Sequence, residues 1–328
     1  MKAELSIRII YRRGLVGTEV EAIDLFQLET FMAVAEERSF SRAALRLHRT
    51  QPAISQVVRK LEEEVEEVLF ERAARDATLT AAGEVLRAYA ERLLNLRGEA
   101  ATALSEFRSL HRGRLNLAAN EYTSLYLLSV LDSFRRVSPQ IKVTVQRSLA
   151  SRMTEELMQH AVEFGVISYR PDDPQIRSIV VYRDELVLAL HPRHPLARLK
   201  QVSIHQLGPE NFIAHNIPSP LRQKVVQAFR RHRIPLNMGV ELPSLEAIKR
   251  FVAMGNGVAL LPRLTARPEI ERGELVQVRV PELVLEHRLR LVHRRHATLS
   301  HAANAFLKVV ESLANERGDP FQYQIERG

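Results

Sequence analysis

Side chains able to hydrogen-bond to nucleic acid gather in one short stretch near the N-terminus, FSRAALRLHRTQPAISQVVRKL. Arginine can reach guanine edges and phosphates, glutamine can read adenine, and serine or threonine can donate to several bases. At the start and outer face of the second half of this stretch stand Arg49, Thr50, Gln51, Ser55, Gln56 and Arg59. Their types and spacing predict contacts with base edges and phosphates.

Apolar residues in the same stretch predict two short helices that would position those side chains. Intervals of three and four occur in two sets, and the polar break His48-Arg49-Thr50 separates them. The apolar positions are Phe40, Ala43, Ala44 and Leu47, followed by Ala53, Ile54, Val57 and Leu61. Ser41 can cap the first helix and Thr50 the second, with Pro52 in the first turn, where its missing N–H has no cost. The pair is typical of a helix-turn-helix.

Flanking segments predict a small winged domain around this pair. A helix over residues 25–37 would brace it from behind, because apolar Leu28 and Phe31 share one helical face. After the second helix, LFER and TLT flank the polar segment AARDA, which is consistent with a two-stranded wing. Arg72 and Arg75 lie where a wing would meet the DNA backbone or minor groove. Solvated surface is the alternative interpretation of both arginines.

The run from Ile23 to Leu86 resembles the DNA-binding domain of LysR-type transcriptional regulators. The matching segments are DLFQLETFMAVAEERSFSRAALRLHRTQPAISQVVRKLEEE, then LFER, then LTAAGE, in the family's order and spacing. Val65-Glu66 departs from the Leu-Gly that the family usually has there. The resemblance implies binding to a double-stranded DNA operator. The expected DNA-binding residues are Ser41, Arg42, Arg49, Thr50, Gln51, Pro52, Ser55, Gln56, Arg59, Arg72 and Arg75.

The predicted DNA-binding part is not the basic part of the chain. The formal net charge is +8, but residues 24–80 hold eight Lys and Arg against eleven Asp and Glu, whereas residues 113–328 hold thirty against twenty-one. The acids cluster at positions 62–64 and 66–67, at the far end of the second helix, where they need not face phosphate. DNA binding therefore depends on where individual arginines point, and not on net charge.

Residues 81–111 predict a long helix with an apolar seam. Apolar residues recur at alternating threes and fours, which is the 3.5-residue period of a coiled coil. The seam contains Leu86, Tyr89, Leu93, Leu96, Ala100, Ala103, Phe107 and Leu110. At ~1.5 Å per residue the run is about 45 Å long, too long for the preceding small domain to cover. We expect a homodimer or homotetramer paired through Leu86, Tyr89, Leu93, Leu96 and Phe107; packing on the chain's own later domain is the alternative.

From Gly113 onward the pattern alternates strands with helices. Strands at 115–119, 141–145 and 164–167 with helices at 123–137 and 151–161 give βαβαβ, which predicts a parallel sheet. A second unit has strands near 186–190, 212–214, 238–241 and 257–261 and helices at 221–232 and 244–253. A strand at 289–293 and a helix at 300–313 close the chain, and the polar tail from Asn315 is expected to fray. Two such units with a late return predict two lobes around a cleft, as in periplasmic binding proteins.

This half also resembles the effector domain of the LysR family, through GRLNLAA, VEFGVI, RDELVLALHPRHPLA and MGNGVALLP. The expected fold class is α/β multidomain, with an N-terminal winged helix-turn-helix, a long linker helix and a C-terminal two-lobed α/β effector-binding domain. Its expected parts are an extension at 1–22, the DNA-binding domain at 23–80, the linker at 81–112, the effector-binding domain at 113–316 and a tail at 317–328. Lobe I would hold 113–168 and 287–315, and lobe II would hold 169–286.

Hydroxyls and amides follow several predicted strands, where a cleft between two lobes binds its ligand. Helix amino termini present free N–H groups at these places, which favours a small polar or anionic effector. The candidate effector-binding residues are Asn120, Thr123, Ser124, Ser148, Ser151, His215, Asn216 and Ser219. Helix capping is the alternative role for each serine and asparagine.

Composition excludes several classes of chemistry. The chain has no cysteine, so disulfides, thiol catalysis and Cys-based zinc sites are excluded, and no apolar run approaches the roughly 20 residues needed to cross a bilayer. No Gly-rich phosphate loop, HExxH or GxSxG motif occurs. HPRHP cannot present both histidines on one helix face, and HRRH places arginines beside its pair, so surface histidines are preferred over a metal site.

These observations favour a LysR-type DNA-binding regulator whose operator binding or activation is modulated by a small molecule. We expect no cofactor, no metal, no enzymatic activity, no membrane association and a cytoplasmic location. The rival interpretations are an α/β enzyme and a solute-binding receptor. Neither explains the first 110 residues.

Overall fold

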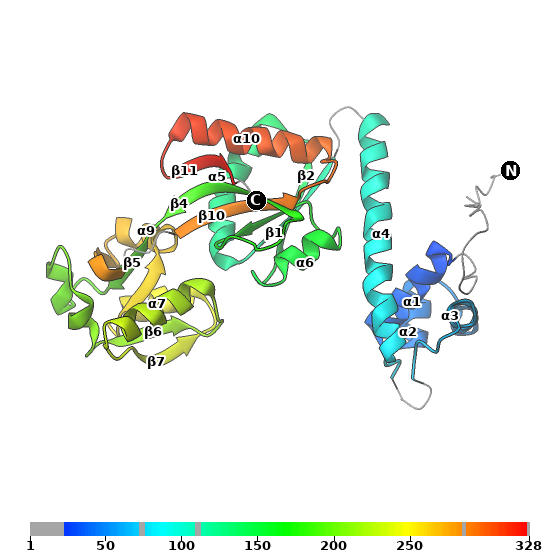
Figure 1. The fold of residues 1–328 in the computed structure, drawn as a ribbon, viewed down its shortest axis with the longest axis horizontal. Coiled ribbons are helices and arrows are strands. Elements are labelled where there is room, and N and C mark those ends of the chain that lie inside the picture. The colour runs from blue at the N-terminus through cyan, green and yellow to red at the C-terminus, as the bar shows by residue number, and fades with distance from the viewer. Residues whose placement is uncertain (1–22, 72–75, 109–112, 284–286, 327–328) are drawn as a thin grey trace. The chain divides into compact units, whose positions relative to one another are not determined.

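The computed structural model describes residues 23–71, 76–108, 113–283 and 287–326. The N-terminal extension expected at 1–22 therefore lies outside the described residues. The chain divides into two units, residues 1–94 and residues 95–328, which are treated separately below. Helix α4 (Ala81–Arg108) begins in the first unit and ends in the second (Figure 1).

The first unit contains the predicted brace and helix-turn-helix. Its helices are α1 (Leu25–Glu37), α2 (Phe40–Arg46), α3 (Gln51–Val65) and the start of α4. Asp24 caps α1 in a capping box with Gln27. Ser39 caps α2 by accepting from the Arg42 amide, so Ser41 is not the cap that the sequence predicts. Thr50 has the N-cap position of α3, with Pro52 in the first turn, but its side chain makes no capping hydrogen bond.

Apolar side chains from all three helices form the core of the first unit. Leu28, Phe31 and Val34 of α1 pack with alanines of α2 and with Ile54, Val58 and Leu61 of α3, and all are at most 4% exposed. Burying each large side chain contributes roughly 1.5–3 kcal/mol. This core fixes the angle between α2 and α3, and so fixes which face of α3 remains in solvent.

The base of the predicted wing is attached to the same core. Phe70 pairs with Leu79 in an antiparallel bridge, and its ring lies 5.4 Å from the rings of Phe31 and Phe40. The Glu62 carboxylate accepts from the amides of Leu69 and Phe70 at 2.8 and 3.3 Å. The wing therefore starts from a rigid point on α3.

Helix α4 divides its apolar residues between the core and solvent. Ala90 is buried in the core of the first unit, and Leu86 and Leu94 pack against that core. Tyr89, Leu93 and Leu96 are 58%, 48% and 47% exposed in the single chain. Leu86 thus belongs mainly to the intramolecular core, whereas the other three leave an apolar surface that a second chain could cover.

A six-stranded mixed sheet forms lobe I, in the order β11-β4-β10-β3-β1-β2. Pairing of β1 with β2 and β3 is parallel, as the βαβαβ pattern predicts, whereas β10, β4 and β11 add antiparallel edges. The strands are β1 (Arg114–Ala119), β2 (Lys142–Arg147), β3 (Phe164–Ile167), β4 (Ile176–Asp184), β10 (His287–Arg294) and β11 (Phe321–Ile325).

Helices cover both faces of this sheet. Residues of α5 (Glu121–Val137) and α10 (His301–Arg317) pack with Leu115, Leu117 and Val166 in one core. The short helix α6 (Met153–Met158) packs with Ala118, Ile167 and Val292 in another. Lobe I therefore has three layers, with β1 and β3 buried in its centre.

Lobe II is built on two smaller sheets. The order β8-β5-β9 joins β5 (Leu186–Leu190), β8 (Ala259–Pro262) and β9 (Val276–Val278), and β6 (Asn211–His215) pairs in parallel with β7 (Asn237–Leu242). Its α-helices are α7 (Pro220–Arg231), α8 (Leu245–Ala253) and α9 (Arg263–Glu271), and the 3-10 turns are Pro195–Arg198, Ile204–Leu207 and Pro281–Leu283. Successive residues of β5 enter the two separate cores of lobe II, so the strand reads as a continuous apolar run.

Four elements differ from the sequence-based expectation. Strand β4 lies within the range expected for lobe II but belongs to the sheet of lobe I, next to β10 (Figure 1). Helix α9 and strand β9 were not predicted. The tail does not fray at Asn315, because α10 continues to Arg317 and β11 then pairs with β4.

Among the described residues, no helix is both long enough and apolar enough to cross a membrane.

Candidate functional site

The outer face of α3 presents the polar residues that the sequence singles out. Ser55 is half-buried, and the exposed members of this surface are Ser41, Arg42, Arg49, Thr50, Gln51, Pro52, Gln56 and Arg59. Gln51 donates to the Ser55 hydroxyl at 2.9 Å, which orders its amide at the start of the helix. The side chains of Gln56 and Arg59 make no hydrogen bond within the described chain, so their donors remain available.

Two arginines near α3 are already oriented by contacts within the domain. The Arg49 guanidinium lies 6.0 Å from the centre of the Phe26 ring. Arg42 donates to the Glu37 carbonyl, with its Nε at 3.1 Å, and is 3.7 Å from the Glu37 carboxylate. Arg72 and Arg75 lie outside the described residues, so their predicted wing contacts remain predictions.

The acidic end of α3 is partly turned inward, which reduces its conflict with DNA phosphates. Glu64 accepts from the side-chain amide of Gln27 at 2.7 Å, and its own side chain is only 8% exposed. Glu62 binds the amides at the base of the wing. Two of the five clustered acids therefore have structural partners within the domain.

A cavity of about 690 Å³ lies between the two lobes of the second unit. Its walls include the ends of β1, β2 and β6, which is where the α/β pattern places a ligand. Five of the eight predicted effector-binding residues line it, namely Asn120, Ser148, Ser151, His215 and Ser219. Thr123, Ser124 and Asn216 are not among its lining residues.

Several of the predicted polar groups are used in local structure. Asn120 and Thr123 form a reciprocal capping box at the start of α5, and Thr123 is fully buried. The Ser124 hydroxyl donates to the Glu121 carbonyl at 2.9 Å, and the Ser219 hydroxyl caps α7. Ser148 donates to Glu156 at 2.8 Å. These serines and asparagines thus fix the cavity walls through the capping role that their residue types favour.

Glu121 crosses the cavity from lobe I to lobe II. Its carboxylate accepts from the Leu245 amide, at the start of α8, at 2.9 Å and lies 3.6 Å from Nε2 of His215. One of its oxygens is buried and has no hydrogen-bond partner among the described residues. A carboxylate of the chain itself therefore occupies a helix amino terminus in the cavity, which is a favourable place for an anion.

Buried Tyr122 and His287 form another wall of the cavity. Their rings stack with centroids 5.2 Å apart, and His287 is 5% exposed with no partner for Nε2 among the described residues. Burial lowers the pKa of His287 to about 4, helped by Lys224 and Arg290. The imidazole is therefore neutral at pH 7 and offers one hydrogen-bonding nitrogen toward the cavity.

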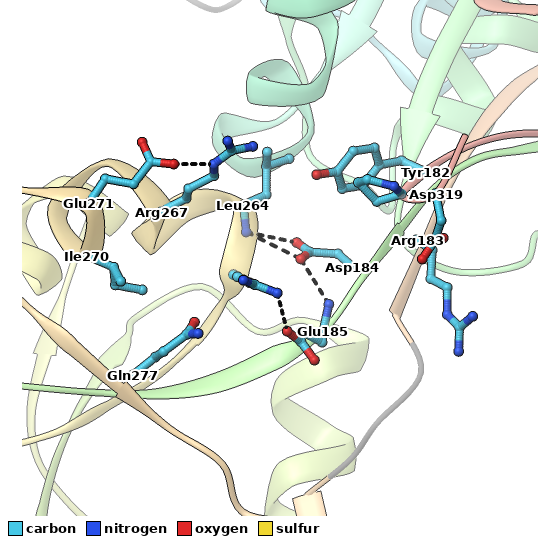
Figure 2. A pocket seen from close by; sticks show the side chains of 12 residues that line it. Tyr182, Arg183, Asp184, Glu185, Leu264, Arg267, Ile270, Glu271, Gln277 and Asp319 are labelled. Carbon is cyan, nitrogen blue, oxygen red and sulfur yellow. Dashed lines mark hydrogen bonds and ion pairs between the residues drawn. The ribbon is translucent and has the colours of Figure 1, made fainter. Parts of the chain in front are cut away.

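Tyr122 also connects this wall to a buried acid. Its hydroxyl donates to Asp184 at 2.7 Å, and Asp184 accepts from the Glu185 amide at 2.9 Å and from the Leu264 amide at 3.3 Å (Figure 2). Burial raises the pKa of Asp184, and these three hydrogen bonds oppose that shift. Burial also raises the pKa of the Tyr122 hydroxyl above its usual range.

The sequence analysis did not single out Glu121, Tyr122 or His287. It searched helix starts for neutral donors, so an acid and an aromatic ring at the same junction received no weight. Glu121 and Tyr122 directly follow Asn120 and could have been found by position alone. His287 enters the site through the pairing of β10 with β4, which no local pattern reveals.

No group of three or more His, Cys, Asp or Glu side chains that could hold a metal ion occurs in the described part of the chain. The described cavity walls supply hydrogen-bond donors, acceptors and rings. This arrangement can bind a small polar molecule through hydrogen bonds, stacking and charge.

Comparison with known proteins identifies both units. Residues 25–84 match the family described as "Bacterial regulatory helix-turn-helix protein, lysR family", and residues 108–314 match "LysR substrate binding domain". A probable RuBisCO transcriptional regulator of Cyanophora paradoxa is 31% identical over 88% of this chain and 91% of its own.

Solved structures show the same fold. The LysR family transcriptional regulator CbnR, also solved in complex with its target DNA, has a TM-score of 0.70 at 22% identity, covering 88% of this chain and 99% of CbnR. The regulatory domain of CcmR from Synechocystis PCC6803, solved in complex with 2-PG, has a TM-score of 0.57 at 25% identity and covers 62% of this chain and 98% of that domain. With both family domains present in order along the sequence, the chain belongs to the LysR family of transcriptional regulators.

Proposed function

We propose that the protein binds operator DNA as a dimer or tetramer through the outer face of α3, and that a small polar or anionic effector in the interlobe cavity modulates this binding. The observation that carries the proposal is the exposed polar surface from Arg49 to Arg59 on a helix held by the core of a LysR-type domain. Neither rival interpretation needs such a surface.

The relatives suggest the class of target genes and effector. Curated relatives at about 30% identity are regulators of RuBisCO genes, and the CcmR regulatory domain binds 2-PG. We infer that this chain acts on genes of carbon fixation or a related pathway, in the cytoplasm and without catalytic activity of its own. A small carboxylate or phosphate fits the amide donors and the neutral His287 along the cavity wall.

Gln51→Ala is the direct test of DNA recognition. A helix that enters the major groove offers its first turn to base edges, and losing one good base contact costs roughly 1–3 kcal/mol. The variant should weaken binding to the promoter region beside the gene, with little change on random DNA. Titration of labelled DNA at fixed salt measures both affinities.

Two further variants make this experiment interpretable. Arg59→Ala removes an expected phosphate contact, so it should weaken both DNAs and reduce the salt dependence. Gln223→Ala removes an exposed glutamine in the first turn of α7, outside the helix-turn-helix, and should change neither. Equal losses on operator and random DNA for Gln51→Ala would refute its assigned role.

The same titration tests the effector half of the proposal. Repeating it with 2-PG and with a panel of small carboxylates should reveal at least one compound that changes operator affinity. An effector can shift DNA binding only by its differential affinity for two conformations of the chain. Unchanged affinity across the whole panel would contradict an anionic effector while leaving DNA recognition intact.

A further inference from the structure

A second cavity, of about 830 Å³, lies at the hinge between the lobes and is distinct from the interlobe cavity. We call it the hinge pocket; its working residues are Tyr182, Arg183, Glu185, Arg263, Arg267 and Gln277. Glu185 is the single residue between β4 of lobe I and β5 of lobe II. A ligand in this pocket would therefore contact the point where the chain first passes from one lobe to the other.

The hinge pocket contains arginines whose present partners are weak competitors. Arg263 pairs with Glu185 at 2.8 Å, and Arg267 pairs with Glu271 at 2.6 Å (Figure 2). All four side chains are more than half exposed, and exposed pairs of this kind contribute only ~0.2–1 kcal/mol. A ligand carboxylate can replace either glutamate, because the displaced glutamate returns to water at small cost.

Other groups of the pocket also lack partners. The side chain of Arg183 makes no ion pair or hydrogen bond with any described residue. The same holds for the Tyr182 hydroxyl, whose pKa burial raises to about 12, so that it remains a donor. On another wall, Oε1 of Gln277 is buried without a hydrogen-bond partner within the described chain. The pocket therefore has donors for an anion and a separate acceptor for a hydroxyl.

Apolar side chains complete the pocket. Leu264 and Ile270 of α9 line it between the two arginine pairs (Figure 2). The Asp184 carboxylate, which also lines it, already accepts from Tyr122, Glu185 and Leu264, so it does not need a ligand. The cavity volume is within the range of sites that hold small organic molecules.

We propose that the hinge pocket is a second ligand site, which binds a small hydroxy acid. Its carboxylate bonds to Arg263 and Arg267, its hydroxyl donates toward Gln277, and its carbon body lies on Leu264 and Ile270. This proposal does not depend on DNA binding or on the effector of the interlobe cavity. The occupied pocket is one hydrogen bond away from that cavity, because Asp184 lines the first and Tyr122 lines the second.

Calorimetry on the full chain with malate and with 4-hydroxybenzoate tests the site. At least one of the two acids should bind, and Arg263→Ala with Arg267→Ala should weaken its binding tenfold or more. The matched control is Arg136→Ala with Arg250→Ala, which removes two equally exposed i,i+4 pairs outside the pocket and should leave binding unchanged. Arg263→Lys with Arg267→Lys keeps both charges, and should bind more tightly than the double alanine variant.

Each alternative result has a clear meaning. Failure of both acids to bind the intact chain overturns the proposal. Equal binding by the intact chain and a double alanine variant of native circular dichroism also overturns it, as does equal weakening by the control pair. If the alanine variant does not fold, equal affinity of the double lysine variant and the intact chain, together with unchanged binding by Gln277→Leu, overturns it instead. Operator titration of the same proteins keeps this outcome separate from the proposed function.

Discussion

His287 is a buried imidazole whose protonation is linked to folding. Its pKa is about 4 in the folded chain and about 6.5 when exposed, so only the unfolded chain binds a proton between these values. Stability should therefore be unaffected by this group above pH 6.5, and should fall as the pH drops from 6.5 toward 4. The loss at the acid end is on the order of 3 kcal/mol. Burial also lowers the pKa of His293, which adds a loss of the same sign.

His287→Phe isolates this contribution. Phenylalanine keeps a ring beside Tyr122 but has no titrating nitrogen. Urea denaturation at pH 7.0, 5.5 and 4.5 should show a smaller decrease in unfolding free energy for the variant than for the intact chain. Parallel pH profiles for the two proteins would show that His287 is not the titrating group.

At the scale of single residues, the sequence located the polar face of α3 well. Arg49 to Arg59 could be assigned because helical periodicity separates exposed from buried positions within a few turns. The cap of α2 was misplaced by two residues, from Ser39 to Ser41, since either serine can accept from a first-turn amide. Glu121 and His287 could not be assigned to the cavity, because their partners lie more than 90 residues away.

Helix α4 is the element on which assembly depends. Tyr89, Leu93 and Leu96 form an apolar surface that remains exposed in the single chain, whereas neighbouring Ala90 is buried. Three large side chains in water at heptad spacing predict a partner helix. The described helix ends at Arg108, and the side chain of Phe107 lies outside what the structure describes, so its place in the seam remains a prediction.

Leu93→Asp with Leu96→Asp should abolish pairing through this surface. Two carboxylates would be buried against a partner helix, each costing several kcal/mol without a counter-charge. Sedimentation should then show monomers with operator binding much weaker than that of the intact chain. Val137→Asp with Leu128→Asp changes two exposed apolar residues of α5 and serves as the control. An intact oligomer after the α4 changes would exclude the seam.

The elements that the sequence missed share a physical cause. β4 and β5 are separated by Glu185 alone, so no turn residue marks the passage between lobes. Pro268 stands inside α9, where proline normally argues against a helix. β11 is half polar, and its conformation is decided by the free edge of β4, far away in the sequence. Local patterns cannot reveal a strand whose stability comes from a distant neighbour.

At the scale of the whole molecule, the C-terminal strand should contribute to stability. Phe321 packs its ring against Tyr126 and Tyr182, at 6.1 and 5.2 Å between ring centres, and Glu326 pairs with Arg290 at 2.9 Å. Truncation after Gly318 would expose these rings and the edge of β4. We expect a loss of about 2–4 kcal/mol, from apolar area and an unpaired, largely buried arginine.

Thermal denaturation of the truncated chain measures this effect. A chain that lacks only residues 327–328 retains β11 and is the control. The truncated chain should melt several degrees lower than the control and aggregate more readily. Identical melting temperatures would mean that β11 adds nothing to lobe I.

The strand order of lobe I has a consequence for how the protein is made. Lobe II occupies one continuous stretch between Leu186 and Leu283, whereas the six-stranded sheet needs β1 from one end of its domain and β10 and β11 from the other. A chain leaves the ribosome from its N-terminus, and parts fold as they emerge. Lobe II can therefore fold while the sheet of lobe I is still incomplete. The cavity between the lobes gains its His287 wall only near the end of synthesis, so a nascent chain cannot assemble the complete ligand site before its last strands are free.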